Sequence, residues 1–116
     1  MAILIASFSE DKKTEAHVKK VIELENWEKI IVVSEAQTKI DTKKTVDYIY
    51  VNMAKRLPEL SSDIMTKIRN KLNGIDVAVN IISGSGKLHM ALLSAILKLG
   101  YGIRFIVLTE HGIKEI

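Results

Sequence analysis

Short runs rich in isoleucine and valine recur along this chain, separated by longer and more polar stretches. Most of the runs are apolar at consecutive positions rather than at every second one, which is typical of strands covered on both faces of a sheet. We therefore expect five β-strands, at residues 2–7, 29–34, 46–51, 77–82 and 103–109.

Three of the intervening stretches repeat apolar residues at helical spacing and predict amphipathic helices. Their expected ranges are 11–25, 58–73 and 88–99. Ser7 and Glu10 have the spacing of a capping box before the first helix, whereas Pro58 opens the second helix and Gly74 follows its end. Residues 35–45 are polar and predict a loop or a short helix over the sheet.

The alternation of strands and helices predicts an α/β domain with a mainly parallel sheet and right-handed crossovers. The simplest arrangement is a Rossmann-like three-layer fold with five strands in the order 3-2-1-4-5, numbered along the chain. A chain of 116 residues is long enough for one hydrophobic core and too short for a second folded module, so residues 1–116 are expected to form a single domain. In that order the chain reverses direction between the first and fourth strands, where open parallel sheets bind ligands.

A turn of small residues, Ser83-Gly84-Ser85-Gly86-Lys87, joins the fourth strand to the last helix. Glycine lets the backbone approach a ligand closely, and the first N–H groups of a helix offer donors to an anion. Lys87 supports an anion site, because a cation in the first turn of a helix opposes the macrodipole unless a negative group lies there. The other interpretation is structural, with a tight turn in which Ser83 or Ser85 caps the helix.

This turn departs from the Walker A motif, G-x-x-x-x-G-K-[ST], at two positions. Ile81 stands in place of the first glycine, and Leu88 stands in place of the hydroxyl residue that would hold magnesium. An ATP-hydrolysing P-loop is therefore not favoured.

The loop after the first strand, Ser7-Phe8-Ser9-Glu10, also carries serines and also leads into a helix. Because the first and fourth strands are neighbours in the expected sheet, this loop and the glycine-rich turn should meet in one crevice at the carboxyl ends of the strands. Helix capping is the alternative role for Ser7 and Ser9.

The charge pattern and the composition limit the class of ligand that the protein is expected to bind. A formal charge of +3 comes from dispersed lysines, with only three arginines and two phenylalanines, so direct DNA or RNA binding is not favoured and a small anionic ligand fits better. There is no cysteine, and His17, His89 and His111 lack metal-ligand spacing, so we expect no metal and no cofactor. The sequence shows no basic leader and no long apolar span, which predicts a cytoplasmic protein without a membrane partner.

The last helix carries a second apolar stripe, formed by Met90, Leu93 and Leu97, in addition to the stripe that would face the sheet. A helix that is apolar on nearly all sides needs a cover on both sides. We expect that cover to be a second copy of the chain in a two-fold homodimer. The alternative is that residues 35–45 or the carboxyl tail fold over the helix.

From Val46 onward the chain reads YIYV, a helix, DVAVNIISGSGK, an apolar helix and YGIRFIVLTEHG. This succession resembles the CRISPR-associated Rossmann-fold (CARF) domains, and in particular the sensor domain of archaeal CRISPR transcription regulators. Asn80 and Ile81 match the Asn-Ile-Thr that often ends the family's strand, and Ile82 stands for its threonine. The turn that follows is a looser version of the family's Gly-Gly-Thr-Lys turn.

The resemblance implies a homodimer that binds a cyclic oligoadenylate second messenger of antiviral defence, cyclic tetra-adenylate foremost, across its two-fold axis. The ligand-binding residues it implies are Ser7, Phe8, Ser9, Glu10, Asn80, Ser83, Gly84, Ser85, Gly86 and Lys87. One alternative adds metal-independent cleavage of the ring, a ring nuclease in which Ser9 or Ser7 positions a ribose hydroxyl and Lys87 stabilises the developing charge. Another is a protein interaction module with no nucleotide ligand.

Overall fold

One six-stranded sheet organises the chain. In the computed structural model, which describes residues 2–116, the strand order is β3-β2-β1-β4-β5-β6. The first five strands are parallel, and β6 pairs with β5 in the antiparallel sense. The strands are β1 (Ile3–Phe8), β2 (Lys29–Ser34), β3 (Asp47–Tyr50), β4 (Asp76–Asn80), β5 (Gly102–Thr109) and β6 (Gly112–Glu115). The α/β class and the order 3-2-1-4-5 are confirmed for the five expected strands.

The expectation of five strands was wrong by one, because β6 adds an antiparallel edge strand. A tight turn at Glu110 and His111 reverses the chain, and Thr109 lies opposite Gly112 in the register. Gly112 has a φ of +96°, a left-handed conformation that glycine adopts without steric cost. The four residues of β6 contain no apolar run, so pairing with β5, rather than a hydrophobic pattern, makes them a strand.

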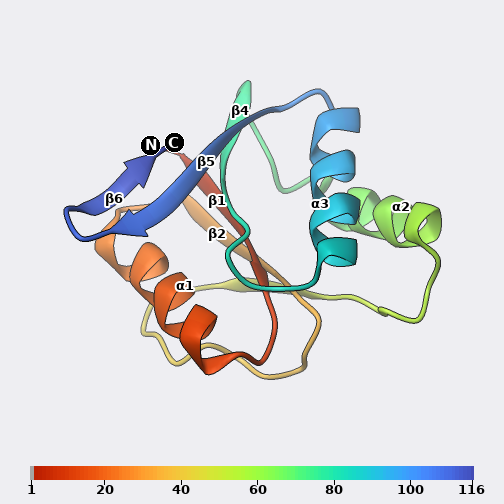
Figure 1. Cartoon of the computed structure of the whole chain (residues 1–116). Helices are drawn as coiled ribbons and strands as arrows, with labels where there is room; N and C mark the ends of the chain where they lie inside the picture. Colours follow the sequence, from red (N-terminus) through yellow and green to blue (C-terminus); the bar gives the residue numbers. More distant parts are fainter. Residues whose placement is uncertain (1) are drawn as a thin grey trace.

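Helices cover both faces of the sheet, which confirms the three-layer arrangement. The helix α1 (Lys12–Leu24) lies on one face, and α2 (Leu57–Ile68) and α3 (Gly86–Lys98) lie on the other (Figure 1). Within residues 2–116, none of the helices is both long enough and apolar enough to cross a membrane.

The helix ends differ from the expected ones, and α3 begins at Gly86 instead of residue 88. Asp11 caps α1, since its side chain accepts a hydrogen bond from the Lys13 amide at 3.1 Å. The capping box of Ser7 and Glu10 is therefore wrong, because Ser7 belongs to strand β1. The helix α2 ends at Ile68, before the glycine signal, and residues 69–71 form a turn instead of continuing the helix.

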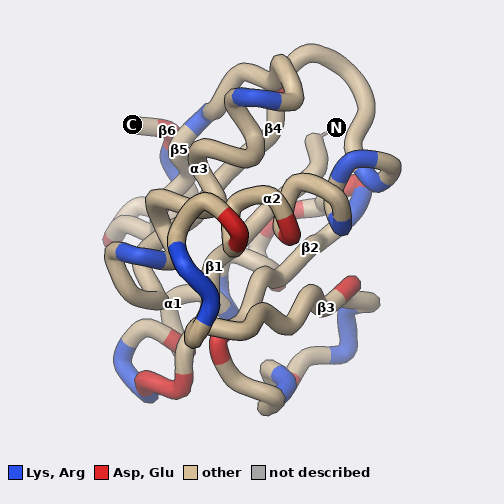
Figure 2. The backbone as a smooth tube through the Cα atoms, turned by 90° about the vertical axis from the view of Figure 1, so that its right-hand side faces the viewer, with Lys and Arg blue, Asp and Glu red and all other residues tan. Residues whose placement is uncertain are grey.

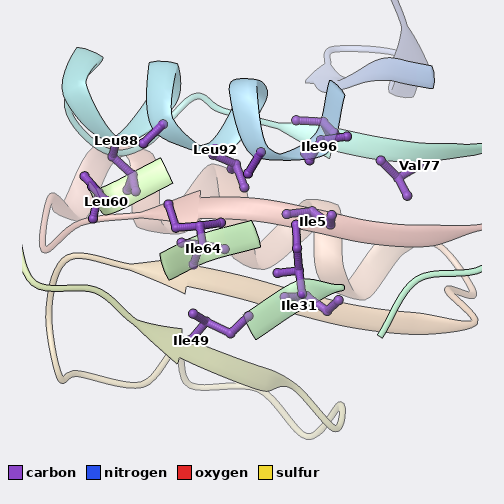
Figure 3. Close-up of a cluster of buried hydrophobic side chains, with 14 of the residues drawn as sticks. Ile5, Ile31, Ile49, Leu60, Ile64, Val77, Leu88, Leu92 and Ile96 are labelled. Atoms are coloured by element: carbon purple, nitrogen blue, oxygen red, sulfur yellow. The ribbon is translucent and has the colours of Figure 1, made fainter. Parts of the chain in front are cut away.

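The core on the α2 and α3 face fixes where α3 begins. Buried side chains of α3 point toward the sheet and toward α2 (Figure 3). They pack with isoleucines and valines of β1, β2, β3 and β4 and with side chains of α2. The residues of this cluster that Figure 3 labels are Ile5, Ile31, Ile49, Leu60, Ile64, Val77, Leu88, Leu92 and Ile96. This packing holds the first turn of α3 beside the carboxyl end of β4.

The predicted second stripe of α3 divides into two parts. Met90 and Leu97 are 62% and 59% exposed, whereas Leu93 is half-buried and packs against the core. Neither of the expected intramolecular covers lies on Met90 or Leu97. The segment 35–45 is a loop whose Ile40 packs on the α1 face, and the carboxyl tail pairs with β5 as β6.

Candidate functional site

The loops after β1 and β4 meet at the carboxyl edge of the sheet, as the strand order predicted. The Ser9 amide donates to Ser83 Oγ at 2.9 Å, and the Ser7 hydroxyl donates to the Ser83 carbonyl. From α1, Thr14 Oγ1 donates to the same Ser83 Oγ at 3.0 Å. Ser83 is 1% exposed. Its buried hydrogen bonds therefore link the two loops to each other and to α1.

The glycine-rich turn has the geometry of a capped helix start. Ser85 is the N-cap of α3, and its Oγ accepts from the Leu88 amide at 3.2 Å. Gly84 has a φ of +98°, and a Cβ there would lie 3.1 Å from Leu88 Cδ2, so both conformation and space require glycine. The structural interpretation is thus right that Ser85 caps α3.

His89 also supports the turn. Its Nε2 lies 2.7 Å from the Ser83 carbonyl oxygen. Because a carbonyl can only accept, this contact requires that Nε2 carry the proton and donate. The imidazole is therefore fixed as a brace for the turn that precedes α3.

Asn80 lies at the end of β4 and is 1% exposed. Its Nδ2 donates to the Ile106 carbonyl at 2.7 Å and lies 3.1 Å from His17 Nε2, while its Oδ1 accepts from the Ile82 amide at 3.3 Å. All hydrogen-bonding groups of this side chain are used inside the protein, where they connect β4, β5 and α1.

The hydrogen bonds of His17 define its tautomer. The Leu108 amide donates to His17 Nε2 at 3.3 Å, so Nε2 is an acceptor and also accepts from Asn80. Burial lowers the pKa of His17 from its ordinary value of 6.5.

We expect acid to destabilise the protein through His17. A lowered pKa in the folded state means that the unfolded chain binds the proton more readily. The stability from neutral His17 is complete above pH 6.5, the ordinary value, and is lost as the pH falls below it. Urea midpoints measured between about pH 8 and about pH 5 should fall less for His17→Gln than for the wild type. The exposed His111, changed to Gln, is the control, and an identical pH profile for all three proteins would contradict the assignment.

A carboxylate from another loop occupies the N-terminus of α3. Glu35, which follows β2, accepts from the Ser85 amide at 2.9 Å and from the Ser85 hydroxyl at 2.5 Å, both at its Oε1. Lys87 points to a fourth loop, where its Nζ donates to the Met53 carbonyl at 2.8 Å. The loops after β1, β2, β3 and β4 therefore all contribute to this edge.

Sequence reasoning missed Glu35, Thr14 and Met53. A signal for Glu35 was present, because it directly follows the second strand and carboxyl ends of parallel strands share one edge. No comparable signal pointed to Thr14 in α1 or to Met53, whose carbonyl rather than its side chain makes the contact.

The ten residues expected at the ligand site differ in accessibility. Phe8 lies in the core on the α1 face, and Ser7, Asn80 and Ser83 are buried with internal partners. Glu10 is exposed and accepts from Thr38 Oγ1. The members open to solvent at the turn are Ser9 and Gly84, which are half-buried, and Ser85, Gly86 and Lys87, which are exposed.

A hollow of about 470 Å³ lies at the opposite, amino ends of the strands. Trp27, Asp76 and Arg104 are among its lining residues. Arg104 lies 3.9 Å from carboxylate oxygens of Asp76 and Glu115, so these neighbours offset its charge. Ligands of open parallel sheets bind at carboxyl ends, so the turn remains the stronger candidate.

Neither the charged residues in the view of Figure 2 nor the potential metal ligands of residues 2–116 form a single cluster. Lysines, arginines, aspartates and glutamates are dispersed over the view in Figure 2 rather than gathered in one region. Among residues 2–116, no group of three or more His, Asp or Glu side chains is placed to hold a metal ion.

No family model, curated protein or solved structure matches this chain. The fold and the site define a Rossmann-like α/β protein with helix N-terminal donors at the switch point between β1 and β4.

Proposed function

We propose that this protein binds a cyclic oligoadenylate, cyclic tetra-adenylate foremost, as a homodimer, and acts as a CRISPR-linked sensor or sequestering module. The observation that carries the proposal is the anion at the turn. Ser85 holds a carboxylate oxygen with its amide and its hydroxyl at the start of α3. A phosphate oxygen has the charge and acceptor capacity to take the same place.

The exposed part of the turn offers further N–H donors to a phosphate. The amides of Gly86 and Lys87 belong to the first turn of α3, where N–H groups have no acceptor within the helix. Lys87 adds a cation that reaches Met53 in the free protein and is exposed to solvent. The nucleotide identity rests on the resemblance of DVAVNIISGSGK to the CARF turn.

Exposed apolar surface supports the homodimer. Met90 and Leu97 lie on the outer side of α3, and an apolar hollow of about 310 Å³ lies over β4 and β5. Ile82 and Ile116 contribute to that hollow and are 47% and 79% exposed. A two-fold axis would place two copies of the turn on one ligand, which suits a cyclic ligand with repeated phosphates.

Cyclic tetra-adenylate should bind to the wild type and bind about 5- to 150-fold more weakly to Lys87→Ala, because a charge-assisted contact to phosphate contributes about 1–3 kcal/mol. Isothermal titration calorimetry measures both affinities. Lys98→Ala is the matched control, since Lys98 is an exposed lysine at the other end of the same helix. Absence of binding for all linear and cyclic oligoadenylates would overturn the proposed function.

The same samples separate the alternatives. Light scattering at micromolar concentration should give the mass of two chains, and a monomer would remove the symmetric site. With chelator present, the recovered ligand should be intact. Linear products with cyclic phosphate ends would instead identify a ring nuclease, for which Ser9 and Lys87 are the candidate groups.

A further inference from the structure

Glu35 occupies the position that the proposed function assigns to a ligand phosphate. We propose that its carboxylate is an internal competitor, which must leave the N-terminus of α3 before a phosphate of the ligand can bind there. This inference rests on the proposed function and adds a feature of the protein that limits its affinity for the ligand. It starts from an anion that is already seated at the helix, contributed by a loop 50 positions away from its partner Ser85.

Glu35 and a phosphate would use the same donors. Oε1 of Glu35 takes both the Ser85 amide and the Ser85 hydroxyl. The hydroxyl also accepts from the Leu88 amide as the helix cap, so its one proton is committed to Glu35. A phosphate oxygen cannot accept from this amide and hydroxyl while the carboxylate oxygen remains.

The carboxylate can be displaced without moving its loop. The Glu35 amide donates to the Phe8 carbonyl at 3.0 Å, which ties the backbone to the end of β1. Next to it, Ser34 Oγ donates to the Ala36 carbonyl at 2.6 Å and accepts from the Ala36 amide at 3.0 Å. Rotation of one half-buried side chain therefore suffices to open the turn.

No strong partner retains the carboxylate. Within residues 2–116, no lysine, arginine or histidine nitrogen lies within 4.0 Å of Glu35, and Lys87 contacts Met53 instead. Donors from a single residue hold Glu35, whereas a phosphate would add the attraction of Lys87. The ligand then binds to the fraction of molecules in which the turn is open, which weakens its apparent affinity.

Neutralising Glu35 should therefore tighten binding. Glu35→Gln keeps the shape of the side chain but removes its charge. Its hydrogen bonds to Ser85 become weaker, and it no longer repels a phosphate. We expect the dissociation constant for cyclic tetra-adenylate to fall by about 5- to 50-fold, since hydrogen bonds to an ionised group are roughly twice as strong as neutral ones. Glu35→Ala, which removes the acceptor as well, should bind at least as tightly as Glu35→Gln.

Calorimetric titration of wild type, Glu35→Gln, Glu35→Ala and Glu59→Gln with cyclic tetra-adenylate tests the inference. Glu59 is an exposed glutamate in the first turn of α2, and its change should leave affinity within about twofold. If the wild type binds and neither Glu35 variant binds more tightly, while circular dichroism shows them folded, the competitor role is overturned and the proposed function stands. If no protein binds, the proposed function falls and the inference with it. Binding by the Glu35 variants alone would support Glu35 as a competitor but would overturn the proposed function, because the wild-type turn would stay closed to the ligand.

Discussion

Replacing Leu92 with alanine should lower the free energy of unfolding by about 2–5 kcal/mol. Leu92 lies in the middle of α3, is fully buried, and packs in the core cluster that α2 and α3 form with the sheet. Removing its side chain loses the transfer free energy of three carbons and leaves a cavity between elements that cannot collapse onto each other. Urea denaturation followed by circular dichroism measures the change.

Leu24→Ala makes the same chemical change at a position that is 56% exposed at the end of α1, and it should cost no more than about 0.5 kcal/mol. Equal losses for both variants would contradict the packing of α3. Because the same packing positions the turn, Leu92→Ala should also weaken ligand binding at temperatures where part of the protein is unfolded.

Replacing Asn80 with leucine should lower the free energy of unfolding by about 2–4 kcal/mol, since one buried partner and two partly buried partners would each lose a hydrogen bond. The carbonyl of Ile106 and the amide of Ile82 would be left without Asn80, and His17 Nε2 would lose one of its two donors. The measurement is again urea denaturation, at a pH near 8 where His17 is neutral.

Asn73→Leu is the matched control. Asn73 is exposed, and its Nδ2 donates to Glu28 Oε2 at 2.8 Å on the surface. This change should stay within about 0.5 kcal/mol. A loss for Asn80→Leu as small as that for Asn73→Leu would show that the cluster of Asn80 and His17 does not hold β4, β5 and α1 together.

Local pattern was sufficient for most of the elements. The strand at residues 29–34 was predicted to the residue, because four consecutive apolar residues are buried on both faces of the sheet. The turn before α3 was found from its glycines and serines, and Ser85 indeed caps that helix. Connection rules for parallel sheets then predicted which two loops would meet.

The errors share one cause, which is that the missed features depend on pairing partners rather than on the local hydrophobic pattern. The edge strand β6 exists through its pairing with β5, and its composition carries no strand signal. Ser7 had the spacing of a cap for α1, but its hydroxyl instead donates to the Ser83 carbonyl, 76 positions away. A single sequence contains no record of such a competition between partners.

The sequence by itself determined the class of fold, the order of the five parallel strands and the position of the glycine-rich turn that starts α3, because hydrophobic periodicity, glycine placement and chain connectivity are local properties. Only the tertiary structure decided which groups accept hydrogen bonds from the donors of that turn. Adjacent carboxyl ends of β2, β1 and β4 bring Glu35 to Ser85 and the Ser9 amide to Ser83. Which side chain takes each donor depends on distances between strands, and these exist only once the sheet has formed.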